Sequence, residues 1–107
     1  MPLVILGLKT CDTCRKARKA LPDARFRDIR DTPLTAAEID NLLSMFGDKL
    51  INRASTTWRG LDDTARSTDA ASLLAAHPAL MKRPVIQAEK GAWLGWTAQT
   101  RAALNLT

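Results

Sequence analysis

The two cysteines of this chain, Cys11 and Cys14, have Cys-x-x-Cys spacing and directly follow an apolar run at residues 3–8. If that run forms a buried strand and the residues after Cys11 open a helix, Cys11 lies at a strand-to-helix turn over the free N–H groups of a helix N-terminus. Such groups favour an anion, and a cysteine pKa there can fall from about 8.5 to roughly 3.5–7.5. Cys11 is therefore expected to react as a thiolate.

Positive charge is concentrated around this pair. The formal net charge is +5, and residues 9–30 hold eight Lys or Arg against three Asp, whereas the rest of the chain is balanced. Arg15 and Lys16 would favour a thiolate and an anionic substrate, while Asp12 opposes them. Nucleic acid is a rival partner, but no nucleic-acid-reading motif is present and Phe26 is the segment's one aromatic residue. A solvated helix face is the third interpretation.

Three chemistries compete for the cysteine pair. A tetrahedral zinc site needs four ligands, and His77 is the one further cysteine or histidine in the chain, so the sequence predicts no metal. A purely structural disulfide is also disfavoured, because so small a loop removes little entropy from the unfolded chain. Thiol–disulfide exchange is the favoured interpretation.

Length and composition indicate one domain. At 107 residues, of which 46% are hydrophobic, the chain suits a single globular domain spanning residues 1–107. The first apolar run is far shorter than a transmembrane span of about 18–20 residues, and it lacks the basic start and cleavage site of a signal peptide. A cytoplasmic location without a membrane partner is expected. The balanced charge outside residues 9–30 predicts no association surface, hence a monomer.

The first thirty residues predict a strand, a helix and a second strand. Apolar spacing indicates a helix over residues 13–21, which Pro22 ends, and a less regular pattern indicates a strand over residues 24–30. Placing the cysteines at the first turn of a strand–helix–strand unit is typical of a thioredoxin-like redox motif. The first half of the chain therefore points to an α/β fold.

Residues 31–82 are different and predict mainly helix. A capping box formed by Thr35 and Glu38 opens a strongly periodic helix. Residues 52–63 show no clean period and are interpreted as a loop passing into a short helix. A further capped helix is expected over residues 70–76. This region is interpreted as an insertion within one fold.

The C-terminal part predicts a β-hairpin and a helix. Two strand-like segments, residues 85–88 and 92–96, flank a short connection at 89–91 that contains glycine. Thr97 then offers an N-cap for a last helix whose apolar positions extend to Leu106.

Three ordered motifs give the chain a family resemblance. Residues 11–17, Cys-Asp-Thr-Cys-Arg-Lys-Ala, are followed by Thr56–Arg59, Thr-Thr-Trp-Arg, and by Lys82–Pro84, Lys-Arg-Pro, before the hairpin. With these motifs the chain resembles the arsenate reductase-like (ArsC-like) family, and within it the small YffB-type branch. The resemblance implies a thioredoxin-like fold with a helical insertion, residues 31–82, between the second and third strands. It also implies glutathione as a thiol co-substrate.

The resemblance assigns roles by position. Cys11 matches the nucleophile, and Arg53 and Arg83 match two arginines that converge on the thiolate and a bound oxyanion. Guanidinium groups suit that role because their forked donors fit oxyanions. Without the resemblance, the favoured interpretation of each arginine taken singly is an ordinary surface residue, because long charged side chains are mostly exposed. Pro84 matches a proline held in cis facing the cysteine. From the residues alone, Arg15 is expected to lower the pKa of Cys11.

Two departures from the family pattern bear on function. Trp96 lies in the segment where arsenate reductases of this type carry a third arginine, which counts against arsenate as the substrate. Cys14 has no counterpart in those enzymes but has one in the similar Spx-type regulators. It could resolve a mixed disulfide on Cys11, or pack as a small buried side chain. The alternative function is therefore an Spx-like regulator that binds RNA polymerase through a Cys11–Cys14 switch.

Overall fold

The computed structural model describes residues 3–89 and 91–104, and the chain forms two compact units. One, here called the sheet unit, comprises Met1–Ile29 and Arg83–Thr107. The other, the helical unit, is the continuous stretch Arg30–Lys82. The prediction that residues 1–107 form a single domain, which would unfold in one transition, is not tested by this division and stays a prediction.

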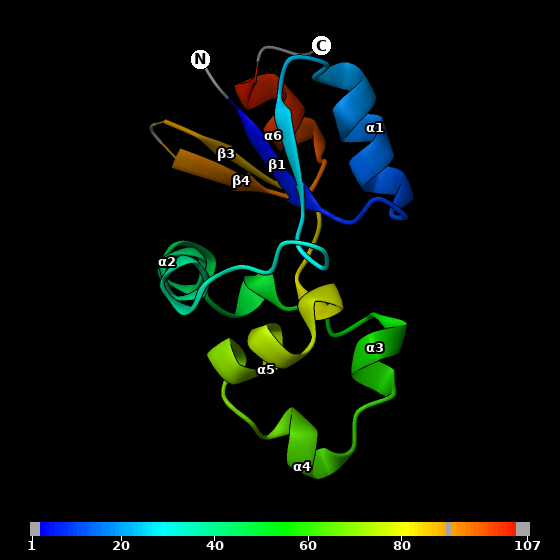
Figure 1. The fold of residues 1–107 in the computed structure, drawn as a ribbon, viewed down its shortest axis with the longest axis vertical. Helices are drawn as coiled ribbons and strands as arrows, with labels where there is room; N and C mark the ends of the chain where they lie inside the picture. The colour runs from blue at the N-terminus through cyan, green and yellow to red at the C-terminus, as the bar shows by residue number, and fades with distance from the viewer. Residues whose placement is uncertain (1–2, 90, 105–107) are drawn as a thin grey trace. The chain divides into compact units, whose positions relative to one another are not determined.

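The sheet unit is built on a four-stranded sheet in the order β2-β1-β3-β4, with β1 parallel to β2 and the other pairs antiparallel. Figure 1 shows the central strands β1 and β3 between the edge strands. The strands are β1 (Val4–Gly7), β2 (Arg25–Asp28), β3 (Val85–Ala88) and β4 (Gly91–Leu94). The apolar run predicted as a strand is thus the buried β1.

Helix α1 (Asp12–Ala20) connects β1 to β2 and packs on the sheet through one stripe. Ala17 forms a fully buried cluster with Ile5 of β1 and Ile86 of β3. Cys14, one turn before Ala17, is also fully buried, as its i, i+3 spacing predicts. Partly buried apolar residues surround this cluster, including both tryptophans of the β4 region and Leu104 at the end of α6 (Ala98–Ala103). The sequence therefore places Cys14 on the core side of α1.

The helical unit begins with the helix that carries the strongest local signal. Helix α2 (Ala36–Phe46) opens with the predicted capping box: Glu38 N–H donates to Thr35 Oγ1 at 3.1 Å, and Thr35 N–H donates to Glu38 Oε1 at 2.9 Å. It ends at Gly47, whose φ of 59° is a conformation that glycine adopts without strain. Ile39 and Leu42 face the core.

Thr35→Ala tests this cap. Removing the hydroxyl leaves the Glu38 N–H without its capping acceptor, so the free energy of unfolding should fall by about 1 kcal/mol. Urea denaturation followed by circular dichroism measures the loss. Thr64→Ala, at an exposed position inside α4 (Asp63–Arg66) rather than at an N-cap, is the matched control and should change stability much less.

The rest of the helical unit consists of short elements. The 3₁₀ turns are Gly47–Leu50 and Pro78–Leu80, and the helices are α3 (Thr56–Arg59), α4 and α5 (Ala70–Ala76). Asp69 caps α5 by accepting from Ser72 N–H, as predicted, and Leu73 and Leu74 are buried. Helix α3 lies in the stretch expected to pass from a loop into a short helix, and no second short helix corresponding to α4 is predicted from the sequence.

The hairpin and the last helix follow the prediction, except that both ends of the second strand are corrected: β4 ends at Leu94 and not at Trp96, because the backbone turns at Gly95 with a φ of 83°. Gly91 is not part of the connection, because it pairs with Ala88 as the first residue of β4. Thr97 caps α6 by accepting from Thr100 N–H. Leu106 lies outside the described residues. No helix in the described ranges has the length and apolarity needed to cross a membrane.

Candidate functional site

Cys11 lies at the N-cap of α1, in the short turn that follows β1. Its backbone is extended, with φ −84° and ψ 121°, its N–H donates to the Leu8 carbonyl at 3.1 Å, and its carbonyl accepts from Arg15 N–H at 3.0 Å. The side chain is partly exposed and both cysteines are free thiols. The helix N-terminus predicted under Cys11 is therefore present.

The pKa of Cys11 is lowered from the usual 9.0 by the balance of opposing effects. Partial burial, the largest single effect, raises the pKa. Hydrogen bonds from the Cys14 N–H and thiol, the positive charge of Arg83 and the Thr13 N–H together lower it more. The Cys11 side chain makes no cap hydrogen bond to the first turn of α1. The Cys14 and Thr13 donors lower its pKa because they stabilise the thiolate, the charged form. Cys11 is the more acidic of the two thiols.

Cys14 has the opposite character. Its pKa is raised to about 12, chiefly by burial and also by its hydrogen bond with Cys11 and the negative charge there, against opposing effects of the Leu8 backbone and Arg83. It packs against Gly7 of β1, where an added Cβ would collide with Cys14 Sγ. The pair is therefore divided into an accessible thiolate and a buried thiol that donates to it.

The Lys-Arg-Pro motif reaches the same site. The Arg83–Pro84 peptide bond is cis, as the resemblance predicted, and Pro84 is fully buried with its carbonyl accepting from Gly95 N–H at 2.8 Å. Arg83 is partly buried, including its Nε, and its charge acts on both cysteines. The structure thus brings Arg83 to Cys11 within the sheet unit.

Arg15 is oriented differently from what its sequence position suggests. Its Nε donates to the Lys9 carbonyl at 3.1 Å, and its Nη1 lies 3.5 Å from Asp12 Oδ1, with both side chains largely exposed. The cation that lowers the pKa of Cys11 in the structure is Arg83. A contribution of Arg15 to that pKa stays a prediction.

Arg53 belongs to the helical unit and is held there by an aromatic contact. Its guanidinium lies 5.2 Å from the centre of the Trp58 ring, and its Nη2 lies 3.9 Å from Asp48 Oδ1. Arg66 approaches the same ring at 5.7 Å and binds the Trp58 and Arg59 carbonyls. Trp58 of the Thr-Thr-Trp-Arg motif therefore orients Arg53, whose role at Cys11 stays a prediction.

Two residues of the site were not singled out from the sequence. Gly7 gives Cys14 room beside β1, and Asp28 accepts from Lys9 N–H at 2.8 Å, which fixes the start of the cysteine turn. Gly7 carried a usable signal, because a lone glycine in a strand often marks a close approach of another chain segment. Asp28 carried none, since its contact spans nineteen residues of sequence.

Metal chemistry receives no support from the described parts of the chain. Within residues 3–89 and 91–104, no group of three His, Cys, Asp or Glu side chains is placed to hold an ion. His77 ends α5 as its C-cap residue.

Arg83→Gln tests the electrostatics of the site. Because a lowered pKa keeps the thiolate present at lower pH, alkylation of Cys11 should rise with pH with a midpoint below 9.0 in the wild type. Removing the Arg83 charge should move that midpoint upward and slow alkylation several-fold at neutral pH. Iodoacetamide rates read at the Cys11 peptide by mass spectrometry give the profile. Arg83→Lys should restore part of the shift, and an unchanged midpoint in Arg83→Gln would contradict this assignment.

Comparison with known proteins agrees with the geometry. The structure resembles that of the YffB protein, with a TM-score of 0.86, 29% sequence identity, and coverage of 94% of this chain and 96% of that one. It also resembles an arsenate reductase (ArsC) related protein from Brucella melitensis, with a TM-score of 0.75, 38% identity, and coverage of 99% and 97%. These likenesses confirm the predicted α/β, thioredoxin-like fold with its helical insertion.

A regulator is among the sequence relatives. The global transcriptional regulator Spx of Bacillus subtilis is 32% identical over 97 residues, which cover 81% of this chain and 74% of Spx. The resemblance to both YffB-type and Spx-type proteins is thus confirmed. The family model of ArsC matches residues 6–104, from within β1 to the end of α6, and this chain accordingly belongs to the ArsC family.

Proposed function

We propose that this protein is a thiol–disulfide oxidoreductase of the cytoplasm that uses Cys11 as its nucleophile and glutathione as its thiol co-substrate. The observation that carries the proposal is the division of the cysteine pair into an accessible Cys11 of lowered pKa and a buried Cys14 of raised pKa. Thiolate is the attacking form in disulfide exchange. Membership of the ArsC family supports thiol-based reduction in general.

The reaction proceeds through a mixed disulfide. The Cys11 thiolate attacks one sulfur of a substrate R–S–S–R′, forming Cys11–S–S–R and releasing R′–S⁻, which takes up a proton. A second thiol then attacks the Cys11 sulfur and releases R–SH, leaving Cys11 joined to Cys14 or to glutathione. One further glutathione frees Cys11 from the glutathione adduct and leaves as glutathione disulfide, whereas a Cys11–Cys14 disulfide needs two successive glutathiones, the first forming a mixed disulfide with one cysteine and the second releasing it. Over one cycle the substrate disulfide gains two electrons and two protons, and two reducing thiols lose them.

Cys14 becomes a better attacking group during this cycle. Two of the effects that raise its pKa, its hydrogen bond with Cys11 and the Cys11 charge, depend on the free thiolate. Both disappear once Cys11 is bound in a mixed disulfide, while the Arg83 charge remains. Formation of the first intermediate therefore favours ionisation of Cys14, which supports resolution by the internal thiol over simple packing.

The arginines and the proline are proposed to hold the substrate. Arg83 stabilises the Cys11 thiolate and negative charge on a bound group, and Arg53 is proposed to add a second cation at the same place. Pro84, buried directly after Arg83, fixes the backbone that faces the substrate. Arsenate is the less favoured substrate, because Trp96 packs against the apolar cluster of the sheet unit where a third arginine would be needed.

Mass spectrometry of the oxidised protein tests the proposal. Protein treated with oxidised glutathione and then quenched with acid should carry either a glutathione adduct on Cys11 or a Cys11–Cys14 disulfide. In a separate glutathione-coupled assay, the protein should show turnover. A protein whose Cys11 stays a free thiol and that gives no turnover would contradict the proposed function. Sedimentation of the same sample tests the proposed monomer.

The similarity to Spx supports a second candidate, a redox-sensing regulator that binds RNA polymerase. In this case a Cys11–Cys14 disulfide would change binding without any turnover. Capture of polymerase by the oxidised protein but not by the reduced protein, together with an inactive coupled assay, would favour the regulator. Equal capture of RNA polymerase by the oxidised and the reduced protein would rule out the redox-sensing regulator.

A further inference from the structure

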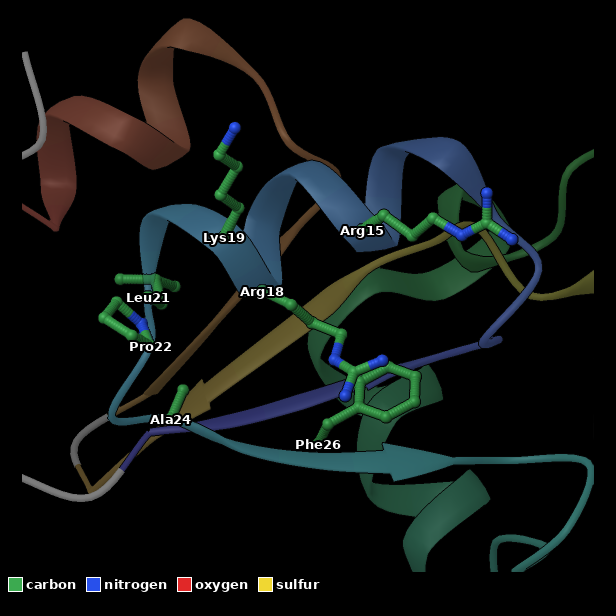
Figure 2. Close-up of a pocket in the computed structure, with 7 residues that line it drawn as sticks. All are labelled: Arg15, Arg18, Lys19, Leu21, Pro22, Ala24 and Phe26. Atoms are coloured by element: carbon green, nitrogen blue, oxygen red, sulfur yellow. The ribbon is translucent and has the colours of Figure 1, made fainter.

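A shallow basic groove, here called the α1 groove, runs beside the exposed face of α1 and is separate from the cysteine turn. Arg15, Arg18 and Lys19 line it from the helix, Pro22 lines it from the turn that follows, and Phe26 lines it from β2. Figure 2 shows Arg18 lying over Phe26 at its centre. The groove is formed entirely within the sheet unit.

The charge of this groove has one sign. Three cations and no acidic side chain are among its described lining residues. Arg18 is held in place, because its guanidinium lies 4.2 Å from the centre of the Phe26 ring. Lys19 extends away from Phe26, as Figure 2 shows, so its ammonium group remains available to a ligand on the outer side. A ligand that fits this groove must therefore carry negative charge for the cations and apolar atoms for the surface formed by Pro22 and Phe26.

The groove lies on the same stripe of α1 as the nucleophile. Cys11, at the N-cap, and Arg15 and Arg18 follow at intervals of four and three residues, which is the spacing of one helix face. With a rise of about 1.5 Å per residue, Arg18 is roughly 10 Å along the axis from Cys11. An extended peptide covers that distance in about three residues. One substrate can thus reach both the sulfur and Arg18.

We propose that the α1 groove binds an acidic segment of a peptidyl or protein disulfide, with a carboxylate about three residues from the cysteine that Cys11 attacks. This inference rests on the proposed oxidoreductase function and adds its substrate class. The carboxylate pairs with Arg18, apolar atoms of the segment pack on Pro22 and Phe26, and Lys19 adds positive charge on the outer side of the groove.

Single-stranded nucleic acid fits the groove less well. Nucleic-acid-binding surfaces of this kind need exposed aromatic faces on which successive bases stack. Phe26 is the single aromatic residue of the described lining, and Arg18 covers its face. The groove therefore offers cations but no face on which successive bases could stack, and this suits a carboxylate on an extended peptide better than a single strand of nucleic acid.

Matched peptides test the proposal. Two short peptides differ only in glutamate or glutamine about three residues from a central cysteine, and each is supplied as a mixed disulfide with 2-mercaptoethanol. The wild type should reduce the glutamate peptide with a kcat/KM about tenfold higher, equivalent to about 1.4 kcal/mol. Arg18→Gln/Lys19→Gln should remove the preference. Lys16→Gln/Arg101→Gln, which removes two exposed cations of the same unit outside the groove, should keep it.

A binding experiment separates this inference from the proposed function. Cysteine-free versions of the peptides are titrated into the isotope-labelled protein, and the Phe26 resonances are followed by NMR. Glutamate-dependent shifts that Arg18→Gln/Lys19→Gln abolishes support the groove even if no disulfide is reduced, in which case only the oxidoreductase function fails. A preference that survives in the groove variant, a preference lost equally in the control variant, or tighter binding of a single-stranded oligonucleotide would overturn the inference.

Discussion

Cys11→Ser is expected to lower kcat/KM for disulfide reduction roughly a thousandfold or more, because no other described thiol is both accessible and acidic. The hydroxyl that replaces the thiol cannot form a disulfide with the substrate. Fold and stability should be nearly unchanged, since Cys11 makes no side-chain cap hydrogen bond at the start of α1. A glutathione-coupled assay and a urea denaturation curve measure the two effects.

Cys14→Ser is the matched control, because it removes the second thiol of the same pair. This variant should still attack the substrate but accumulate the Cys11 mixed disulfide, visible in the intact mass, until glutathione releases it. Cys14→Ala, which puts no donor in place of the thiol, should raise the pKa of Cys11, because the Cys14 thiol is one of the donors that lower it. Full activity in Cys11→Ser would contradict the assignment of the nucleophile.

Gly7→Ala is expected to lower the free energy of unfolding by about 1–3 kcal/mol, the usual cost of forcing an extra methyl group into a packed core. The added Cβ would meet Cys14 Sγ at an impossible separation and Cys14 Cβ at 3.3 Å. Strand β1 is one of the two central strands and Cys14 is fully buried, so neither can move freely. The alkylation profile of Cys11 should shift as well, because Cys14 donates to it. Thermal and urea unfolding with the pH profile give both readouts.

Gly91→Ala provides a closely matched control, since Gly91 is also a strand residue but a Cβ there would meet nothing within 4 Å. It should leave stability unchanged or slightly improved. The double variant Gly7→Ala/Cys14→Ala removes the sulfur and should recover much of the loss. A Gly7→Ala protein as stable as Gly91→Ala would show that the contact between Gly7 and Cys14 does not constrain the fold.

The elements with strong local signals could be predicted from the sequence. The capping box of Thr35 and Glu38 fixed the start of α2, and the buried stripe through Cys14 and Ala17 fixed the face of α1. The cis bond before Pro84 came from the family resemblance, because no local pattern distinguishes it from the far commoner trans form.

The rest depends on contacts between segments distant in sequence, to which local patterns are insensitive. Arg15 is near Cys11 in the sequence, but the cation that lowers the Cys11 pKa is Arg83, more than seventy positions later. Likewise, neither the fit of Cys14 against Gly7 nor the stacking of Arg18 on Phe26 can be read from spacing. Packing of α1 on the sheet and pairing of β3 with β1 bring these residues together, and helical and strand periods encode neither.

The topology of the sheet unit also sets when the nucleophile becomes reactive during synthesis. Strand β1 needs both β2, which follows it closely, and β3, which leaves the ribosome only after the whole helical unit has been made. A nascent chain that ends before Arg83 already carries Cys11 but lacks the guanidinium that acidifies it. The pKa of Cys11 is therefore expected to stay higher in the nascent chain until its last quarter emerges.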